Sequence, residues 1–219
     1  MKLNSKRTIL VGLAFLSICA FWQMYDSIVP LILTKTFHMN ETFSGAIMAA
    51  DNILALFLLP FFGSVSDKSH TKIGKRMPFI LFGTGCAIIL MNILPLLDNS
   101  YAAQPSGFKT ASFVIVLGLL LVAMGTYRSP AVALMPDVTP KPLRSRANAI
   151  INLMGAVGGI LYLGVAAVLY PNSKTAGVEH VNYQPLFIVV SAIMFLAIAV
   201  LFLTIKEPKL TAENQALEK

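Results

Sequence analysis

The sequence predicts an all-α membrane protein with six transmembrane helices, and three observations carry this prediction. Of the 219 residues, 56% are hydrophobic and only 12% are charged, whereas ordinary soluble domains carry about 25% charged residues. Six apolar runs are each long enough, at about 20 residues, to cross the hydrocarbon core of a bilayer as a helix. The 17 Lys and Arg residues gather in short clusters between these runs, as in the loops of polytopic membrane proteins.

The six predicted spans follow one another with short polar connections. They cover residues 9–33, 44–63, 78–97, 111–135, 147–170 and 185–205. Turn-forming and polar residues separate them, as at 98–100, 140–142 and 171–173. The first run exceeds the 7–15 residues of a signal-peptide core, so we expect a retained span rather than a cleaved signal or a lipoprotein site at Cys19. We expect one six-helix bundle over residues 1–205 and a cytoplasmic tail over residues 206–219.

The distribution of Lys and Arg predicts the orientation of the chain. Thirteen of them fall on the side of the two termini, whereas only Lys35, Lys109 and Lys174 fall on the other side. The remaining one, Arg128, lies inside the fourth run. Because loops rich in Lys and Arg stay in the cytoplasm, we predict cytoplasmic termini and an integral protein of the plasma membrane, surrounded by the lipid bilayer.

The composition and motifs also exclude other classes of protein. A disordered chain needs low hydrophobicity, and a disulfide scaffold needs more than two cysteines. We expect no nucleic-acid partner despite the net charge of +7, because the basic clusters alternate with apolar runs. We also expect no enzyme, catalytic residue, metal site or cofactor, since no Ser/His/Asp set or Cys/His cluster is present and His38, His70 and His180 fall in predicted loops.

Two carboxylates inside the predicted spans indicate a cation site. Asp26 and Asp51 each lie about seven residues from the outer end of their span, so both are about 10 Å deep, with Asn52 next to Asp51. Ionisable residues in lipid are costly and functional by default, and two close carboxylates need a proton or a cation between them. We therefore predict a coupling site for H⁺ or Na⁺. The alternative is a structural pair that is hydrogen-bonded across helices.

A second group of polar residues inside the spans indicates substrate binding. Arg128 lies about 12 Å from the cytoplasmic end of its span, where it either binds a substrate oxygen or a carboxylate, or extends to the interface. Trp22 is four residues before Asp26 and so shares its helical face. With Gln23 and Tyr25 it offers an aromatic face and an amide, which suit a sugar. The alternative for Trp22 is a packed core side chain.

Two stretches of the chain resemble a known family. The second predicted loop reads Gly63-Ser64-Val65-Ser66-Asp67-Lys68 and then Gly74-Lys75-Arg76-Met77-Pro78. A later stretch reads Tyr127-Arg128-Ser129-Pro130-Ala131, then Ala133-Leu134-Met135-Pro136-Asp137 and Arg144-Ser145-Arg146-Ala147-Asn148. Both are similar to signatures of the major facilitator superfamily, and they resemble its branch of glycoside–pentoside–hexuronide cation symporters and sucrose-transporter-like proteins.

The resemblance implies a fold, a function and a partner. Members of the family have twelve helices in two halves, so the chain resembles an N-terminal half with two inverted three-helix repeats. The implied function is cation-coupled uptake of a sugar or related small solute, together with a second six-helix half or a second copy. The implied gating loop contains Gly63, Asp67, Lys68, Gly74, Lys75 and Arg76. The alternative is a non-transporting truncated fragment or an accessory membrane subunit.

Overall fold

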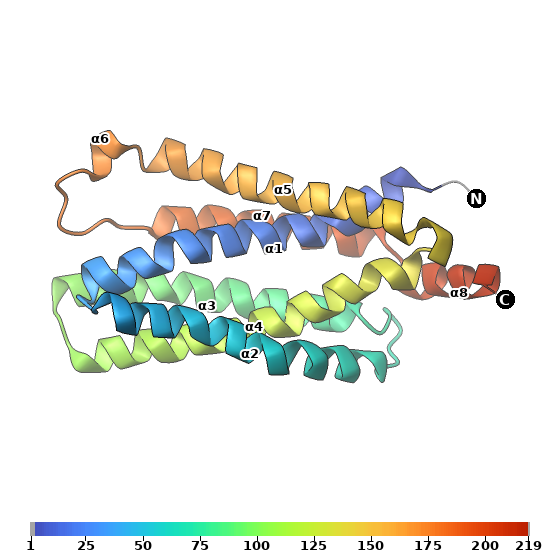
Figure 1. Cartoon of the computed structure of the whole chain (residues 1–219), viewed down its shortest axis with the longest axis horizontal. Helices are drawn as coiled ribbons and strands as arrows, with labels where there is room; N and C mark the ends of the chain where they lie inside the picture. Colours follow the sequence, from blue (N-terminus) through green and yellow to red (C-terminus); the bar gives the residue numbers. More distant parts are fainter. Residues whose placement is uncertain (1–2, 219) are drawn as a thin grey trace.

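The computed structural model describes residues 3–218 and has no strand in this range. Six long helices lie along the molecule, and each runs in the opposite direction to the long helix before it (Figure 1). They are α1 (Ser5–Leu31, continued by the π-helical turn η1, Ile32–Thr36), α2 (Glu41–Asp67), α3 (Met77–Ala103), α4 (Gly107–Val138), α5 (Arg144–Leu169) and α7 (Gln184–Thr204). Three short helices are η2 (Lys141–Leu143), α6 (Asn172–Thr175) and α8 (Glu207–Glu218). The six long helices have the length and hydropathy of membrane spans, which confirms the predicted fold class.

Each long helix begins before its predicted apolar run, and in α1, α2 and α5 polar residues form the added first turn. The side chain of Asn40, for example, caps α2 by accepting the N–H of Phe43 at 2.8 Å. The prediction for residues 98–100 was wrong, since they lie inside α3 instead of a connection. Residues 140–142 and 171–173 do lie between long helices, although η2 and α6 form one turn in each connection.

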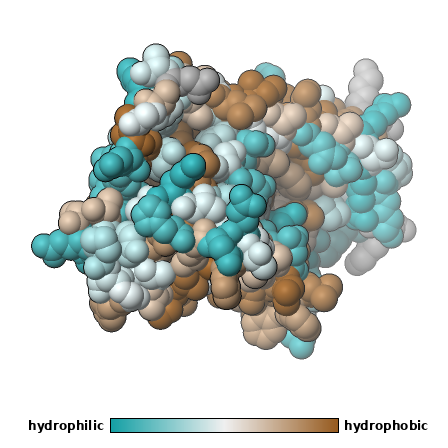
Figure 2. All heavy atoms as spheres, turned by 60° about the vertical axis from the view of Figure 1, so that its left-hand side comes forward, coloured by the Kyte–Doolittle hydropathy of each residue, from teal (hydrophilic) through white to brown (hydrophobic). Residues whose placement is uncertain are grey.

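The two ends of the bundle differ in their loops. Both termini lie at one end (Figure 1), together with loops 68–76 and 139–143 and with α8; we call it the basic end. The opposite end carries loops 37–40, 104–106 and 170–183. Figure 2 shows hydrophilic side chains at the ends of the molecule and hydrophobic ones between them. This distribution suits a bundle whose flanks face lipid.

The helix contacts have the symmetry of an inverted repeat. Helix α1 packs along α5 and α7, α4 packs along α2 and α3, and α3 packs against α7. Exchanging α1 with α4, α2 with α5 and α3 with α7 reproduces the same set of pairs. Because α1 starts at the basic end and α4 at the opposite end (Figure 1), the two three-helix units run in opposite directions, as expected for half of the family fold.

Small residues bring α1 and α5 into backbone contact. A Cβ at Gly158 would overlap the carbonyl oxygen of Leu16, and one at Gly155 would lie 2.9 Å from Sγ of Cys19. Without a hydrophobic driving force between helices in lipid, such close backbone packing is a main source of helix association. Gly164 does not share this role, because no atom lies within 4 Å of a Cβ built there.

Two polar contacts tie helices together inside the bundle. The hydroxyl of Tyr127 on α4 donates to the carbonyl of Ala14 on α1 at 2.8 Å and also contacts the hydroxyl of Ser17. The amide of Asn92 on α3 donates to the hydroxyl of Ser191 on α7 at 2.6 Å. In hydrocarbon such contacts satisfy polar groups that water cannot reach, so they fix how the helices that carry the candidate site sit against one another.

Candidate functional site

Three ionisable side chains lie near the middle of the spans. Asp26 is ten residues before Thr36, the last residue of the first span, and Asp51 is ten residues after Glu41, where α2 begins. Both carboxylates are therefore about 15 Å from the opposite end of their helices. Arg128 is ten residues before Val138 at the basic end of α4. The common depth of the two carboxylates follows directly from the fixed rise of a helix.

A small cavity joins three of the predicted site residues. Trp22 of α1, Asp51 of α2 and Arg128 of α4 line it, together with apolar residues such as Leu58 and with Gly125. The guanidinium carbon of Arg128 lies 5.6 Å from the centre of the Trp22 ring, which is within cation–π range. The cavity holds about 20 Å³, enough for one water molecule but too little for a sugar.

Two buried polar atoms beside this cavity lack a hydrogen-bond partner within residues 3–218. They are the indole nitrogen Nε1 of Trp22, which only donates, and the carboxylate oxygen Oδ1 of Asp51. Leaving such groups unpaired in a low-dielectric site costs free energy. A hydroxyl group both donates and accepts, so one hydroxyl placed between them would satisfy both atoms.

The two carboxylates are neighbours, but their exposure differs. The negative charges of Asp26 and Asp51 interact across the gap between α1 and α2. Asp51 is half-buried at the cavity, whereas Asp26 is exposed on the surface of the bundle, and so is Asn52. Asp51 is therefore the carboxylate that faces Trp22 and Arg128, whereas Asp26 lies on the exposed surface of the bundle beside α2.

The aromatic residues of α1 form one cluster. The rings of Trp22 and Tyr25 meet edge to face with centroids 5.3 Å apart, and Phe21 packs against both. Tyr25 is only 1% exposed and does not line the cavity, and its hydroxyl lacks a hydrogen-bond partner within residues 3–218. Gln23 is exposed next to α5, where a Cβ at Gly159 would lie 3.8 Å from its Oε1.

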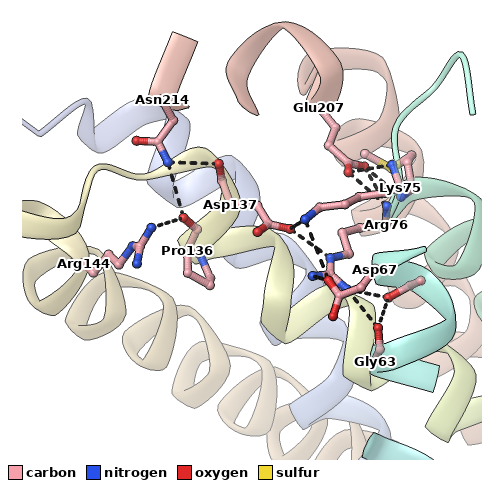
Figure 3. Close-up of polar contacts among 11 residues, drawn as sticks. Gly63, Asp67, Lys75, Arg76, Pro136, Asp137, Arg144, Glu207 and Asn214 are labelled. Carbon is pink, nitrogen blue, oxygen red and sulfur yellow. Dashed lines mark hydrogen bonds and ion pairs between the residues drawn. The ribbon is translucent and has the colours of Figure 1, made fainter. Parts of the chain in front are cut away.

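A charged network closes the basic end of the bundle (Figure 3). The guanidinium of Arg76, 5% exposed, forms an ion pair with Asp67 at the end of α2 and another with Asp137 of α4, the latter at 2.9 Å. It also donates to the hydroxyl of Ser66 and to the carbonyl of Gly63. One buried cation therefore links the ends of α2, α3 and α4, and three of the predicted gating residues take part.

Glu207, the first residue of α8, caps α3. Its carboxylate, on a residue that is 1% exposed, accepts the N–H groups of Lys75 at 2.8 Å, Arg76 at 2.9 Å and Met77 at 2.9 Å. These groups belong to the first residue of α3, to its N-cap and to the residue before the N-cap, at the helix end where a negative charge is favourable. Gly74 makes this possible, because its φ of +119° favours glycine and a Cβ there would overlap the carboxylate.

The end of α4 is held by side chains as well. The amide of Asn214 on α8 donates to the carbonyl of Asp137 at 3.1 Å, and Arg144 donates to the carbonyl of Pro136 at 3.0 Å (Figure 3). The ammonium of Lys75 lies 3.2 Å from the Asp137 carboxylate. Helix C-terminal carbonyls need such partners when they are buried, so α8 stabilises two helix ends at once.

The structure thus places the predicted gating residues in one area and adds others. Gly63 lies where α2 and α4 approach, with a Cβ position 3.1 Å from Oγ of Ser129, and Lys68 is exposed at the C-cap of α2. The sequence reasoning missed the roles of Asp137, Glu207 and Asn214. An available signal was that acidic residues are rare among the basic clusters of this end and therefore stand out.

Comparisons with known proteins agree with this arrangement. The profile of the Major Facilitator Superfamily matches residues 11–219. Sucrose transport protein SUC3 of Arabidopsis thaliana is 34% identical over 158 residues, which are 67% of this chain and 26% of the relative. Sucrose transport protein SUT3 of Oryza sativa subsp. indica is 34% identical over 154 residues, covering 64% of this chain and 30% of the relative.

A relative of another kind is the alpha-ketoglutarate permease of Escherichia coli (strain K12). It is 27% identical over 168 residues, which are 77% of this chain and 34% of the permease. The matched part is therefore only about a quarter to a third of the length of these relatives. With six helices in two inverted units and a profile match over nearly its whole length, the chain belongs to the Major Facilitator Superfamily and corresponds to an N-terminal half of its fold.

Proposed function

We propose that this chain forms half of a secondary active transporter that takes up a sugar or a related small solute together with a cation, H⁺ or Na⁺. The observation that carries the proposal is the pair of unsatisfied buried atoms, Nε1 of Trp22 and Oδ1 of Asp51, beside the Arg128 guanidinium in the middle of the membrane. Unpaired polar groups at this depth are expensive. Their retention is explained by a ligand that pairs with them during transport.

The substrate-binding residues in this proposal are Trp22, Gln23, Tyr25 and Arg128. In a conformation that opens the cavity, the face of the Trp22 ring stacks on the C–H face of a sugar, while Tyr25 holds the ring in place and Gln23 bonds hydroxyl groups. Arg128 binds a hydroxyl or carboxylate oxygen of the solute. The names of the relatives, sucrose transport proteins and an alpha-ketoglutarate permease, support a solute that is rich in oxygen.

The coupling ion in this proposal binds at Asp26 and Asp51, with the amide of Asn52 nearby. Two carboxylates that repel each other in a medium of low dielectric favour uptake of a proton or a cation. Asp51 lies between Asp26 on one side and Trp22 with Arg128 on the other. The same carboxylate can therefore contact both the ion and the solute.

The exposed surface around α2 supports the proposal that a second protein unit packs against this chain. Side chains such as Ile53, Leu56 and Phe57 of α2 are 63%, 70% and 67% exposed, and lipid alone would accommodate them. The exposed Asp26 and Asn52 at the same level are different, because polar groups in mid-membrane face protein or a water-filled cavity. We therefore propose that a second six-helix half, or a second copy of this chain, covers this side.

The remaining residues of the proposal serve gating. They would hold the basic end closed and release it during the transport cycle; these residues are Gly63, Asp67, Lys68, Gly74, Lys75 and Arg76.

We place this end in the cytoplasm, with residues 1–205 as the bundle and 206–219 as a cytoplasmic tail, in the plasma membrane. Single cysteines in loop 104–106 should react with an impermeant thiol reagent added outside intact cells. Reaction of cysteines in loop 68–76 instead would reverse the orientation.

A counterflow assay tests the proposed function. The chain is reconstituted in liposomes alone and together with a C-terminal half of the same family, and the liposomes are loaded in turn with each member of a panel of sugars and dicarboxylates. We expect the assembled pair to exchange at least one labelled solute. Arg128→Ala should abolish this exchange, whereas Lys109→Ala, a matched change in a basic residue at the opposite end, should not. No exchange of any solute by the pair would favour the accessory or non-transporting alternative.

A further inference from the structure

A groove on the surface of the bundle belongs to none of the sites described above. It lies between α3 and α7, holds about 260 Å³, and is lined by residues such as Leu81, Thr84 and Ile88 of α3 and Phe195 of α7. Leu81 is four residues and Ile88 eleven residues after Met77, where α3 begins at the basic end. At the rise of a helix, the groove therefore runs from about 6 Å to about 16 Å below this end. None of the described residues that line it is charged, so we call it the apolar groove.

A second cavity, which we call the lysine pocket, adjoins the apolar groove at the basic end. Phe202 of α7 lines both cavities, so they meet at this ring. The lysine pocket holds about 370 Å³, and its walls combine apolar and basic side chains, among them Ile73, Met77, Lys72, Lys206 and Lys209. Together the two cavities provide a basic mouth at the end of the bundle and an apolar extension along the spans.

The lysines of this pocket are available to an anion. None of the described residues that line the pocket is acidic. Lys72 and Lys206 are exposed, and neither forms an ion pair within residues 3–218. Lys209 is 73% exposed and lies 4.0 Å from Glu213, so this pair contributes little. The carboxylate of Glu207, the residue after Lys206, is already held by N–H groups at the start of α3. The pocket therefore carries positive charge that the described chain does not neutralise.

The hydroxyl of Thr84 is an unsatisfied polar group in the apolar groove. Thr84 is 3% exposed, and its Oγ1 has no hydrogen-bond partner within residues 3–218. Threonines in helices often donate to the carbonyl four residues earlier, as Thr126 and Thr204 do at 3.0 and 2.6 Å. Thr84 lies about 10 Å from the start of α3, near the level where the polar layer of a bilayer gives way to hydrocarbon. Phospholipids carry their ester carbonyls near this level, and such a carbonyl can accept the hydroxyl.

We propose that the lysine pocket and the apolar groove bind one anionic phospholipid from the leaflet at the basic end. Its phosphate contacts Lys72, Lys206 and Lys209, its ester carbonyl accepts from Thr84, and one acyl chain lies along the groove. Basic pockets between helices at the cytoplasmic surface of a membrane suit anionic headgroups. A zwitterionic lipid fits less well, because the lysines repel its own ammonium group.

The bound lipid connects two parts of the basic end. Lys72 belongs to loop 68–76, which contains predicted gating residues, whereas Lys206 lies between α7 and α8. A phosphate that both lysines share holds this loop next to the start of α8, where Glu207 caps α3. The proposal requires only that the basic end lies at a membrane surface, so it depends neither on the orientation of the chain nor on transport.

Fluorescence quenching by brominated lipids tests the proposal. Trp22 is the only tryptophan of the chain, so Trp22→Phe combined with Phe202→Trp gives a reporter protein with one fluorescent ring, at a position that lines both cavities. The whole chain is reconstituted in vesicles of equal parts phosphatidylglycerol and phosphatidylcholine, in which first one lipid and then the other carries brominated chains. A lysine near the surface favours an anionic lipid by about five-fold. We therefore expect the binding constant at this ring to be about 5–25 times larger for phosphatidylglycerol than for phosphatidylcholine.

Matched variants separate a site from general attraction to a basic surface. In the Trp22→Phe background, Phe61→Trp places the reporter on α2, where Phe61 is 59% exposed, and the ratio of the two binding constants should be near one. In the reporter protein, Lys72→Gln with Lys206→Gln should lower the ratio about five-fold or more. Lys6→Gln with Arg146→Gln instead removes the same charge from exposed residues of the same end and should leave the ratio unchanged.

Three results would overturn the proposal. They are a ratio near one at the groove, an equally high ratio at the α2 position, and a ratio that the two lysine changes leave intact. Inorganic phosphate at constant ionic strength should not lower the ratio more than chloride does; a loss in phosphate alone would assign the pocket to the free anion instead of a lipid. If Phe202→Trp fails to fold, Phe195→Trp replaces it, since Phe195 is 62% exposed in the same groove. No arm measures transport, so a failure here is distinct from a failure of the proposed transport function.

Discussion

Replacing Glu207 should destabilise the basic end of the bundle more than replacing any other single charged residue of α8. The carboxylate of Glu207 accepts three consecutive N–H groups at the start of α3 and is buried under Gly74. In Glu207→Ala these groups lose their partner, and the macrodipole of α3 loses the negative charge at its N-terminus. Glu207→Gln keeps one acceptor oxygen but not the charge.

The magnitude follows from the contacts. A hydrogen bond to a charged group contributes about 1.5–3 kcal/mol, and a lost helix cap costs about 0.5–2 kcal/mol. A groove of about 620 Å³ borders Glu207, so water reaches part of the freed backbone and reduces the penalty. We therefore expect Glu207→Ala to lower the free energy of unfolding by about 2–4 kcal/mol and Glu207→Gln by about 1–2 kcal/mol.

The two native cysteines provide the assay. Cys19 and Cys86 are both half-buried within spans, so a thiol-reactive dye reports unfolding in detergent at constant pH. The melting temperature should fall by about 4–16 °C in Glu207→Ala. Glu213→Gln is the matched control on the same helix, because Glu213 is 51% exposed and its ion pairs to Arg7 and Lys209 are 4.0 Å long. A fall in Glu207→Ala no larger than in the control would refute the capping role.

The remaining predictions concern packing, coupling and gating. Gly158→Ala should destabilise the bundle by about 1–3 kcal/mol in the same thermal assay, because the new methyl group overlaps a backbone carbonyl of α1, whereas Gly164→Ala should be near the wild type. Asp51→Asn, in an assembly that transports, should abolish accumulation against a gradient but leave exchange; normal accumulation by this variant and by Asp26→Asn would make the pair structural. Asp67→Ala should slow transport at unchanged equilibrium affinity for the solute, and a large loss of affinity would contradict a gating role.

The spans could be predicted from the sequence because lipid imposes a simple requirement on length and hydropathy. Helix starts were less predictable, since caps such as Asn40 lie outside the apolar runs. Asp98 shows the limit most clearly. Asp-Asn-Ser has the composition of a turn, yet it continues α3, and Asp98 is buried beside His180, 82 residues later in the chain.

The candidate site could likewise be predicted only in part. The depth of Asp26, Asp51 and Arg128 could be predicted because the rise of a helix is constant. Which way each side chain faces could not, since that depends on how neighbouring helices pack. Asp51 lines the cavity, while the adjacent Asn52 is exposed. The signature loop identified Asp67 and Arg76, but their partners Asp137 and Glu207 come from distant segments.

The cap on α3 also bears on how the protein is made. The carboxylate that completes the start of α3 lies 130 residues downstream of Met77, whose N–H it accepts. While the ribosome is still synthesising α4, α5 and α7, α3 is already in the bilayer with this end open. The basic end can therefore reach its final form only after the last span has been inserted and Glu207 has left the ribosome.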